Sequence, residues 1–202
     1  QETVLLNNEL TSYQREERRE IEKILRQLTE YIGPYLKHFK KYLEILAVFD
    51  ATRAKSYLAI EMNASAPLIS KDGNYQLFHF RHPLLYLNYK KQKRKVVENN
   101  LILESSERIL LISGPNAGGK SIVLKSAGLI QLMFQFGMMI PANEGSKLPV
   151  FDKLFVDIGD SQSVENDLST YSSHLRNMKH FTENSTTKTL VLLDELGHGT
   201  DP

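Results

Sequence analysis

The residues best suited to chemistry in this sequence lie in one eight-residue segment, residues 114–121, which reads GPNAGGKS. It fills the pattern G-x-x-x-x-G-K-[ST], in which the backbone N–H groups of a glycine-rich loop surround phosphate oxygens. In such a loop the Lys120 ammonium would reach the β- and γ-phosphates, and the Ser121 hydroxyl would hold Mg²⁺. The whole segment is therefore the predicted nucleotide site: Gly114, Pro115, Asn116, Ala117, Gly118, Gly119, Lys120 and Ser121.

A second group of chemically useful residues ends the segment TLVLLDELG, residues 189–197. An apolar strand that ends in two acids would place Asp194 beside Mg²⁺, directly or through water, and Glu195 where it can deprotonate an attacking water. Glu195 and Lys120 are therefore the predicted catalytic residues. The alternative is an ordinary buried strand that runs into an exposed acidic turn, and a phosphate loop in the same chain disfavours it.

The two adjacent acids also separate classes of nucleotide-binding protein. A switch-type GTPase requires a guanine-reading Asn-Lys-x-Asp segment, which the sequence lacks, and no acceptor site of a kinase is visible. An acid pair at the end of the second strand is typical of ABC-type ATPases, in which the glutamate is the general base. We therefore expect an ATPase with ATP and Mg²⁺ as cofactors.

The elements that must position these residues alternate between strands and helices. Residues 109–112, ILLI, predict a short buried strand before the phosphate loop, and residues 122–137 predict a helix after it. Another helix is predicted at 168–183, and other strands at 75–80, 96–97, 101–103, 153–158 and 189–193. This alternation is typical of an α/β fold, so we predict an ABC-type P-loop ATPase domain over residues 75–202, with a mostly parallel sheet covered by helices.

Two long helices are predicted before that domain. Apolar residues recur at spacings of three and four over residues 5–32, and a second helix is predicted over residues 34–62 after the break at Gly33-Pro34. Because the break is so short, we expect the helices to lie antiparallel as a hairpin of residues 1–63. Proline, serine and glycine in residues 64–74 predict a linker.

Composition restricts the class of protein further. The composition, 41% apolar and 24% charged, is that of an ordinary soluble protein, and the net charge of +1 gives no global field that would favour nucleic acid. The absence of cysteine excludes disulfides and thiol catalysis. No apolar run approaches the roughly 18 residues that cross a membrane, so we expect a cytoplasmic protein. The basic cluster KKQKRK, residues 90–95, predicts a solvated loop. Both ends interrupt expected elements, so the sequence reads as a fragment with its ATPase domain truncated at the C-terminal end.

Several segments of the sequence resemble the MutS family of DNA mismatch repair ATPases. They are GPNAGGKS itself, RHPLL at 81–85, IPANEGSKLPVFDKLFVDIGD at 140–160, DLSTYSSHL at 167–175 and LLDELGHGTDP at 192–202. The segments EERREIEKILRQL at 16–28 and IGDSQSVENDLSTYSSH at 158–174 are similar to the second bacterial branch of the family rather than to its mismatch-repair branch. The resemblance covers essentially the whole chain.

This resemblance implies additional site residues. Asn116 belongs to the family's phosphate loop, and Gln162 falls in a loop that approaches Mg²⁺ and the attacking water. Ser169 and Thr170 would open a helix that binds the γ-phosphate of the nucleotide in the partner subunit, which implies a homodimer with two composite sites. The alternative for Ser169 is a simple helix cap, which is compatible with that role.

The resemblance also bears on His174 and on the first two helices. His174 lies one turn beyond Thr170 and would either face the nucleotide or serve as a structural histidine with its own partner; we favour the second interpretation. In the family, the first two helices are levers and part of a coiled arm that joins the ATPase to a nucleic-acid clamp.

The function that the resemblance implies is the ATP-hydrolysing core of a homodimeric clamp on branched or recombination-intermediate DNA, which suppresses homologous recombination. A nuclease would lie in a C-terminal Smr-type domain outside this sequence. The alternatives are an ATP-driven clamp on stalled or collided ribosomes, with an rRNA contact, a mismatch sensor, or a non-enzymatic interaction module. The expected partners are thus DNA or the ribosome and a second copy of the chain, but no membrane. We expect residues 1–202 alone to hydrolyse ATP weakly or not at all.

Overall fold

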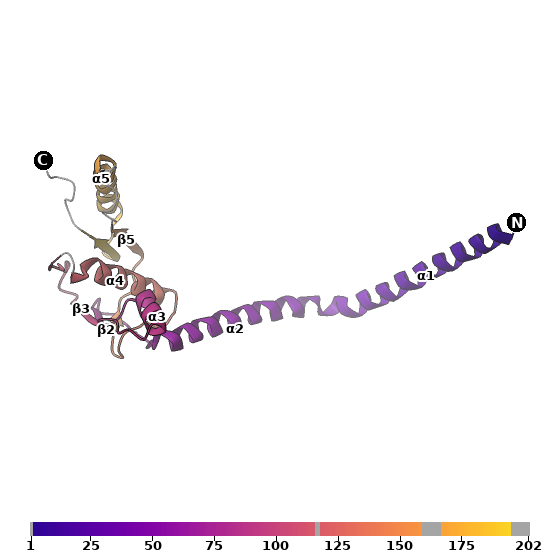
Figure 1. The fold of residues 1–202 in the computed structure, drawn as a ribbon, viewed down its shortest axis with the longest axis horizontal. Helices are drawn as coiled ribbons and strands as arrows, with labels where there is room; N and C mark the ends of the chain where they lie inside the picture. The colour runs from indigo at the N-terminus through magenta and orange to yellow at the C-terminus, as the bar shows by residue number, and fades with distance from the viewer. Residues whose placement is uncertain (1, 116–117, 159–166, 195–202) are drawn as a thin grey trace. The chain divides into compact units, whose positions relative to one another are not determined.

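The computed structural model describes residues 2–115, 118–158 and 167–194, without the side chains of residues 167–173. Figure 1 shows the fold, which divides into two compact units, residues 1–53 and 54–202. The first unit holds helix α1 (Glu2–Ile32), the 3₁₀ helix η1 (Gly33–Tyr35) and most of α2 (Leu36–Met62). Because no residue of α1 is buried, its apolar stripe is exposed in the described unit.

The second unit contains two separate sheets. The larger has the strand order β1-β4-β2-β3, formed by β1 (Leu68–Ile69), β4 (Lys147–Leu148), β2 (Tyr75–Phe80) and β3 (Asn99–Leu103). Strands β5 (Lys153–Asp157) and β6 (Thr189–Leu193) pair in parallel as the smaller sheet, in a register that sets Asp157 beside Leu193. The helices are α3 (Pro83–Lys91), α4 (Lys120–Gln135) and α5 (Asp167–Asn184).

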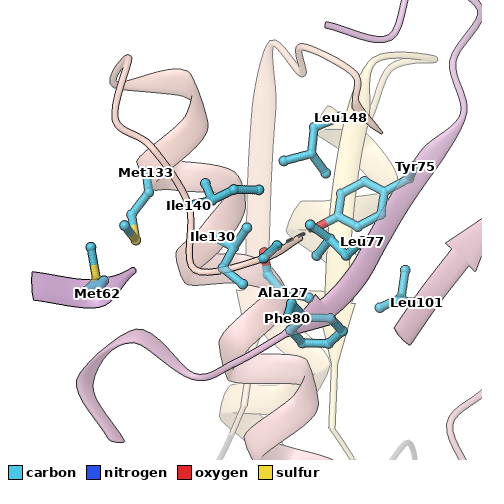
Figure 2. Packing of buried hydrophobic residues seen from close by; sticks show 11 residues of the cluster. Met62, Tyr75, Leu77, Phe80, Leu101, Ala127, Ile130, Met133, Ile140 and Leu148 are labelled. Atoms are coloured by element: carbon cyan, nitrogen blue, oxygen red, sulfur yellow. Dashed lines mark hydrogen bonds between the residues drawn. The ribbon is translucent and has the colours of Figure 1, made fainter. Parts of the chain in front are cut away.

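The hydrophobic core of the second unit forms where α4 packs against β2. Residues at a spacing of three on α4, namely Ala127, Ile130 and Met133, are buried on one face of that helix. Tyr75 and Leu77 alternate inward from β2 to meet them (Figure 2). The packing therefore holds α4, and with it the predicted phosphate loop, against the larger sheet.

One buried hydrogen bond joins these two elements directly. The Tyr75 hydroxyl donates to the backbone carbonyl of Ala127 at 3.1 Å, drawn as a dashed line in Figure 2. Burial raises the pKa of the Tyr75 hydroxyl, because the phenolate would lose its hydration inside the core. The phenol thus remains a neutral donor and fixes the position of β2 along α4.

The predicted ABC-type P-loop domain with a mostly parallel sheet is wrong. The larger sheet is mixed, since β1 pairs parallel with β4 whereas β2 pairs antiparallel with both β3 and β4. The parallel pair β5–β6 forms a separate sheet. Residues 109–112 form no strand, and the side chains of Ile109 and Leu111 are both 85% exposed. An apolar run becomes a buried strand only when a neighbouring strand offers its backbone, and among the described residues β5 and β6 pair only with each other.

The antiparallel pairing predicted for the first two helices is also wrong. Ile32 and Leu36, which flank η1, both have right-handed helical dihedral angles, and Pro34 fits the first turn of the 3₁₀ helix. Because residues 33–35 continue the right-handed helical path, α2 follows α1 end to end instead of turning back beside it (Figure 1). A hairpin would require extended or left-handed residues at this break.

Elements with a strong local pattern are confirmed at nearly the predicted positions. Strands β2 and β6 match the predicted ranges 75–80 and 189–193 residue for residue, and α4 and α5 are within two residues of theirs. The strand predicted at 96–97 is absent, whereas β1 falls in the predicted linker. The domain boundaries proposed at 63/64 and 74/75 stay predictions, as does a cytoplasmic location. Among the described helices, none combines the length and hydropathy needed to cross a membrane.

Candidate functional site

The glycine-rich loop leads directly into the N-terminus of α4. Gly114 has φ +149° and Gly119, the N-cap of α4, has φ +80°, and side chains rarely adopt these conformations. Between them the Gly118 N–H donates to the Pro115 carbonyl at 2.9 Å. A β-carbon built on Gly114 or Gly119 would meet no other atom within 4 Å, so the backbone at both glycines faces open space. An approaching anion can therefore reach it.

Lys120 and Ser121 are the first two residues of the 16-residue helix α4. Such a helix carries partial positive charge and free N–H groups at its N-terminus, and no acidic residue in the first turn offsets them. The Lys120 ammonium folds back and donates to the Gly114 carbonyl at 2.5 Å. This bond shows that the Lys120 side chain reaches back to Gly114, the first residue of the loop in which the sequence predicts the β- and γ-phosphates.

The strand that leads to the predicted acids packs against the same helix. Gly128 of α4 lies so close to β6 that an added β-carbon would be 2.6 Å from the Leu192 Cδ1 methyl. Asp194 follows β6 directly, is half-buried, and donates its N–H to the Asp157 carbonyl at 3.0 Å. The fold therefore brings the helix that begins with Lys120 and the strand that ends before Asp194 into contact.

Sequence reasoning missed one residue of this region, Asp157. It is the last residue of β5, is 8% exposed, and its carboxylate accepts two hydrogen bonds from α5. The His174 Nδ1 lies 2.7 Å from its Oδ2, and the Asn177 amide donates to its Oδ1 at 3.0 Å. This arrangement agrees with the structural interpretation of His174. A signal was present in the sequence, because Asp157 directly follows the apolar run at residues 154–156, and an acid that is buried with such a run requires hydrogen-bond partners.

Other predicted site residues are outside the described residues or lack described side chains. Asn116, Ala117, Gln162 and Glu195 lie outside them, so their predicted roles stay predictions. Ser169 and Thr170 fall within the first turn of α5, as predicted from the sequence, but their side chains are not described. The open loop, the helix N-terminus and the Lys120 ammonium are compatible with a triphosphate. The Ser121 hydroxyl and Asp194 carboxylate are oxygen donors of the kind that Mg²⁺ prefers.

The segment RHPLL has structural roles in the second unit. Arg81 is 9% exposed, and its guanidinium lies 4.5 Å from the Tyr86 ring centroid while donating to the Asn63 carbonyl at 3.3 Å. His82 is the N-cap of α3, where its Nδ1 accepts the Leu85 N–H at 3.3 Å. Partial burial is the main cause that lowers the pKa of His82, and the charge of Lys125 lowers this pKa further.

Comparisons with known proteins agree on one family. Residues 110–202 match the family described as MutS domain V. Over the whole chain, the sequence is 45% identical to Endonuclease MutS2 of Lactobacillus johnsonii, and over 98% of the chain it is 43% identical to Endonuclease MutS2 of Alkaliphilus metalliredigens. The protein of the same name from Finegoldia magna is 42% identical over the whole chain. The chain spans only about a quarter of these relatives, 24% to 25% of their length.

Proposed function

We propose that this chain binds ATP with Mg²⁺ and forms part of the ATP-hydrolysing core of a larger protein. The chain belongs to the MutS2 branch of the MutS family, and this membership supports the proposal. One observation carries the proposal: the glycine-rich loop opens α4, and α4 packs through Gly128 on the strand that ends before Asp194. The predicted phosphate-binding loop and the predicted metal ligand thereby belong to one packed unit.

Each residue of the site then has a definite task. The N–H groups at the start of α4 and the Lys120 ammonium would bind the β- and γ-phosphates. Ser121 and Asp194 would hold Mg²⁺, which supplies charge stabilisation on the phosphates when it is bound. Glu195 would accept the proton of the attacking water. Ser169 and Thr170, in the first turn of α5, would contact the nucleotide of a second copy, which makes a homodimer the active form.

Hydrolysis is tested in the full-length protein with Glu195→Gln. This change keeps the size of the side chain but removes the base, so the turnover number should fall by about 10²-fold or more while ATP affinity stays within about twofold. Glu183→Gln on α5 is the matched control, since Glu183 is an exposed acid. Unchanged hydrolysis by the Glu195→Gln protein would exclude it as the base.

For the whole protein, we propose an ATP-controlled clamp on branched or recombination-intermediate DNA. The curated name of the relatives, an endonuclease, supports a nucleic-acid substrate. We assign any nuclease activity to the whole protein, not to these residues. The proposal predicts that the full-length protein binds four-way junctions more tightly than linear duplex, and that ATP changes this preference.

Ribosome binding and mismatch recognition are the other outcomes of that experiment. Stalled ribosomes that co-sediment with the protein in an ATP-dependent way, without junction binding, would replace DNA by the ribosome as the target. Preference for a mismatched duplex over both a junction and a matched duplex would instead favour a mismatch sensor. Either result would overturn the proposed DNA substrate while leaving the ATPase proposal intact.

A further inference from the structure

Asp157 bonds to two elements of the candidate site at once. Its backbone carbonyl accepts the N–H of Asp194, 3.0 Å away, and its carboxylate bonds to His174 and Asn177 on α5. One residue at the end of β5 therefore links the predicted metal ligand with the helix that carries Ser169 and Thr170.

Both oxygens of the Asp157 carboxylate have well-placed hydrogen-bond partners on α5. His174 and Asn177 are three residues apart, so both project from the same face of α5. An ionised carboxylate only accepts hydrogen bonds, so His174 Nδ1 donates at 2.7 Å and Asn177 Nδ2 donates at 3.0 Å. Both oxygens of Asp157 are thus bonded, and its side chain is only 10% exposed. Solvent competes weakly with bonds in such a position.

The position of α5 matters because of what lies at its start. His174 follows Thr170 by four residues, or about 6 Å along an α-helix. A contact that fixes His174 and Asn177 against β5 therefore also fixes the first turn of α5, because a helix transmits a displacement along its axis. The Asp194 N–H is held by the same residue, so the two groups share one anchor.

We infer that Asp157 is a positioning residue: through His174 and Asn177 it fixes the first turn of α5 relative to Asp194, and so aligns the group that acts on the second subunit's nucleotide. This inference rests on the proposed function. Asp157 takes no part in the chemistry, so its loss should slow turnover without weakening ATP binding. A purely structural role would lower stability alone.

The test compares two replacements of His174 in the full-length protein. In His174→Asn the amide nitrogen occupies nearly the place of Nδ1 and can still donate to Asp157. In His174→Gln the nitrogen lies one bond further out, where Nε2 was, and the bond to Asp157 is lost. We expect the turnover number to fall about tenfold in the His174→Gln protein, the size of one charge-assisted hydrogen bond, and less than threefold in the His174→Asn protein. The ATP dissociation constant should stay within about twofold in both.

A double-mutant cycle adds two proteins, the Asp157→Asn variant and the double variant that carries both Asp157→Asn and His174→Gln. If the two residues act through one contact, the double variant should be no slower than the slower single variant. His180→Gln is the matched control, because His180 is on the same helix but packs edge-on against the Phe155 ring, with centroids 5.4 Å apart. It should change the turnover number by less than twofold.

Several results would overturn the inference. These are equal rates for the His174→Asn and His174→Gln proteins, multiplicative losses in the double variant, or a loss confined to ATP affinity. Comparison with Lys120→Ala separates this failure from failure of the proposed function. If Lys120→Ala abolishes ATP binding while His174→Gln leaves the turnover number unchanged, only the positioning role is wrong. If Lys120→Ala also has no effect, the nucleotide site itself is wrong.

Discussion

Gly128 lies against Leu192, so close that a β-carbon on Gly128 would be 2.6 Å from the Leu192 Cδ1. This contact joins the helix that begins at the predicted phosphate loop to the strand that precedes Asp194. Leu192 is only 7% exposed, so its side chain has little room to move away. The absence of a side chain at position 128 therefore sets how closely α4 approaches β6.

We expect Gly128→Val to lower the free energy of unfolding by about 1–3 kcal/mol, because the added methyl groups overpack this contact. Urea unfolding measures the change. Lys125→Val on the exposed side of the same helix is the control for helix propensity and should cost about 0.5 kcal/mol. Adding Leu192→Ala to Gly128→Val should recover part of the loss; a simple sum of the two losses would contradict the contact.

Removal of the Tyr75 hydroxyl tests the link between β2 and α4. Tyr75→Phe deletes the donor at 3.1 Å from the Ala127 carbonyl while keeping the buried ring. We expect the free energy of unfolding to fall by about 1 kcal/mol. Tyr13→Phe on the exposed face of α1 should have no measurable effect, since Tyr13 is 67% exposed. Equal stability of the Tyr75→Phe protein and the wild type would mean that this bond adds nothing.

Stability should depend on pH through His82. Burial lowers the pKa of His82 in the folded chain from its ordinary value of 6.5, so the unfolded chain binds the proton more tightly. The contribution of neutral His82 to the free energy of unfolding is complete above pH 6.5, and it decreases as the pH falls toward the pKa of His82 in the folded chain. His82→Asn keeps an acceptor at the N-cap of α3 but does not titrate, so it should flatten the fall in stability between pH 7 and pH 5.

The measurement is the urea midpoint of wild type and variant at a series of pH values. His38→Asn, a change on an exposed part of α2, is the control and should leave the pH dependence as it is. A His82→Asn protein whose stability falls with the same slope as that of the wild type would show that another group is responsible.

Helix α1 should be much less protected from hydrogen exchange than α4. No residue of α1 is buried, whereas α4 buries six residues of its 16. Most of the stability of a helix in a protein comes from tertiary packing of its apolar face, so a helix without such packing opens locally and often. We expect the amides of α1 in the 202-residue chain to exchange at least about tenfold faster than those of α4. Equal protection in the two helices would mean that another surface covers α1.

Local patterns explain what could be predicted from this sequence. Residues 75–80 and 189–193 became β2 and β6 because apolar β-formers bounded by polar and turn residues favour strands wherever they lie. Residues 109–112 have an equally apolar pattern but form no strand, because strand formation depends on a partner that the segment itself does not encode. The break at Gly33-Pro34 was likewise visible, but its dihedral angles decided the direction of α2.

Only part of the candidate site could be predicted from the sequence, for the same reason. The phosphate loop is contiguous, so its residue types and spacing predicted a glycine-rich loop followed by a helix, and Gly119 is indeed the N-cap of α4. The contact of Asp157 with His174 joins two residues that are 17 positions apart in the sequence, and no motif marks it. A buried acid indicates that partners exist, but only the packing of α5 on β5 shows which they are.

A comparison of ATP binding between the 202-residue chain and its Lys120→Ala variant tests whether residues 114–121 form a nucleotide site. Calorimetric titration with ATP and Mg²⁺ gives the dissociation constants, and Lys125→Ala, which removes the same charge from the same helix, is the control. We expect Lys120→Ala to weaken ATP binding by about tenfold or more, because a charge-assisted bond to phosphate is lost, and Lys125→Ala to stay within about twofold of wild type. Unchanged affinity in the Lys120→Ala chain would contradict a nucleotide site at residues 114–121.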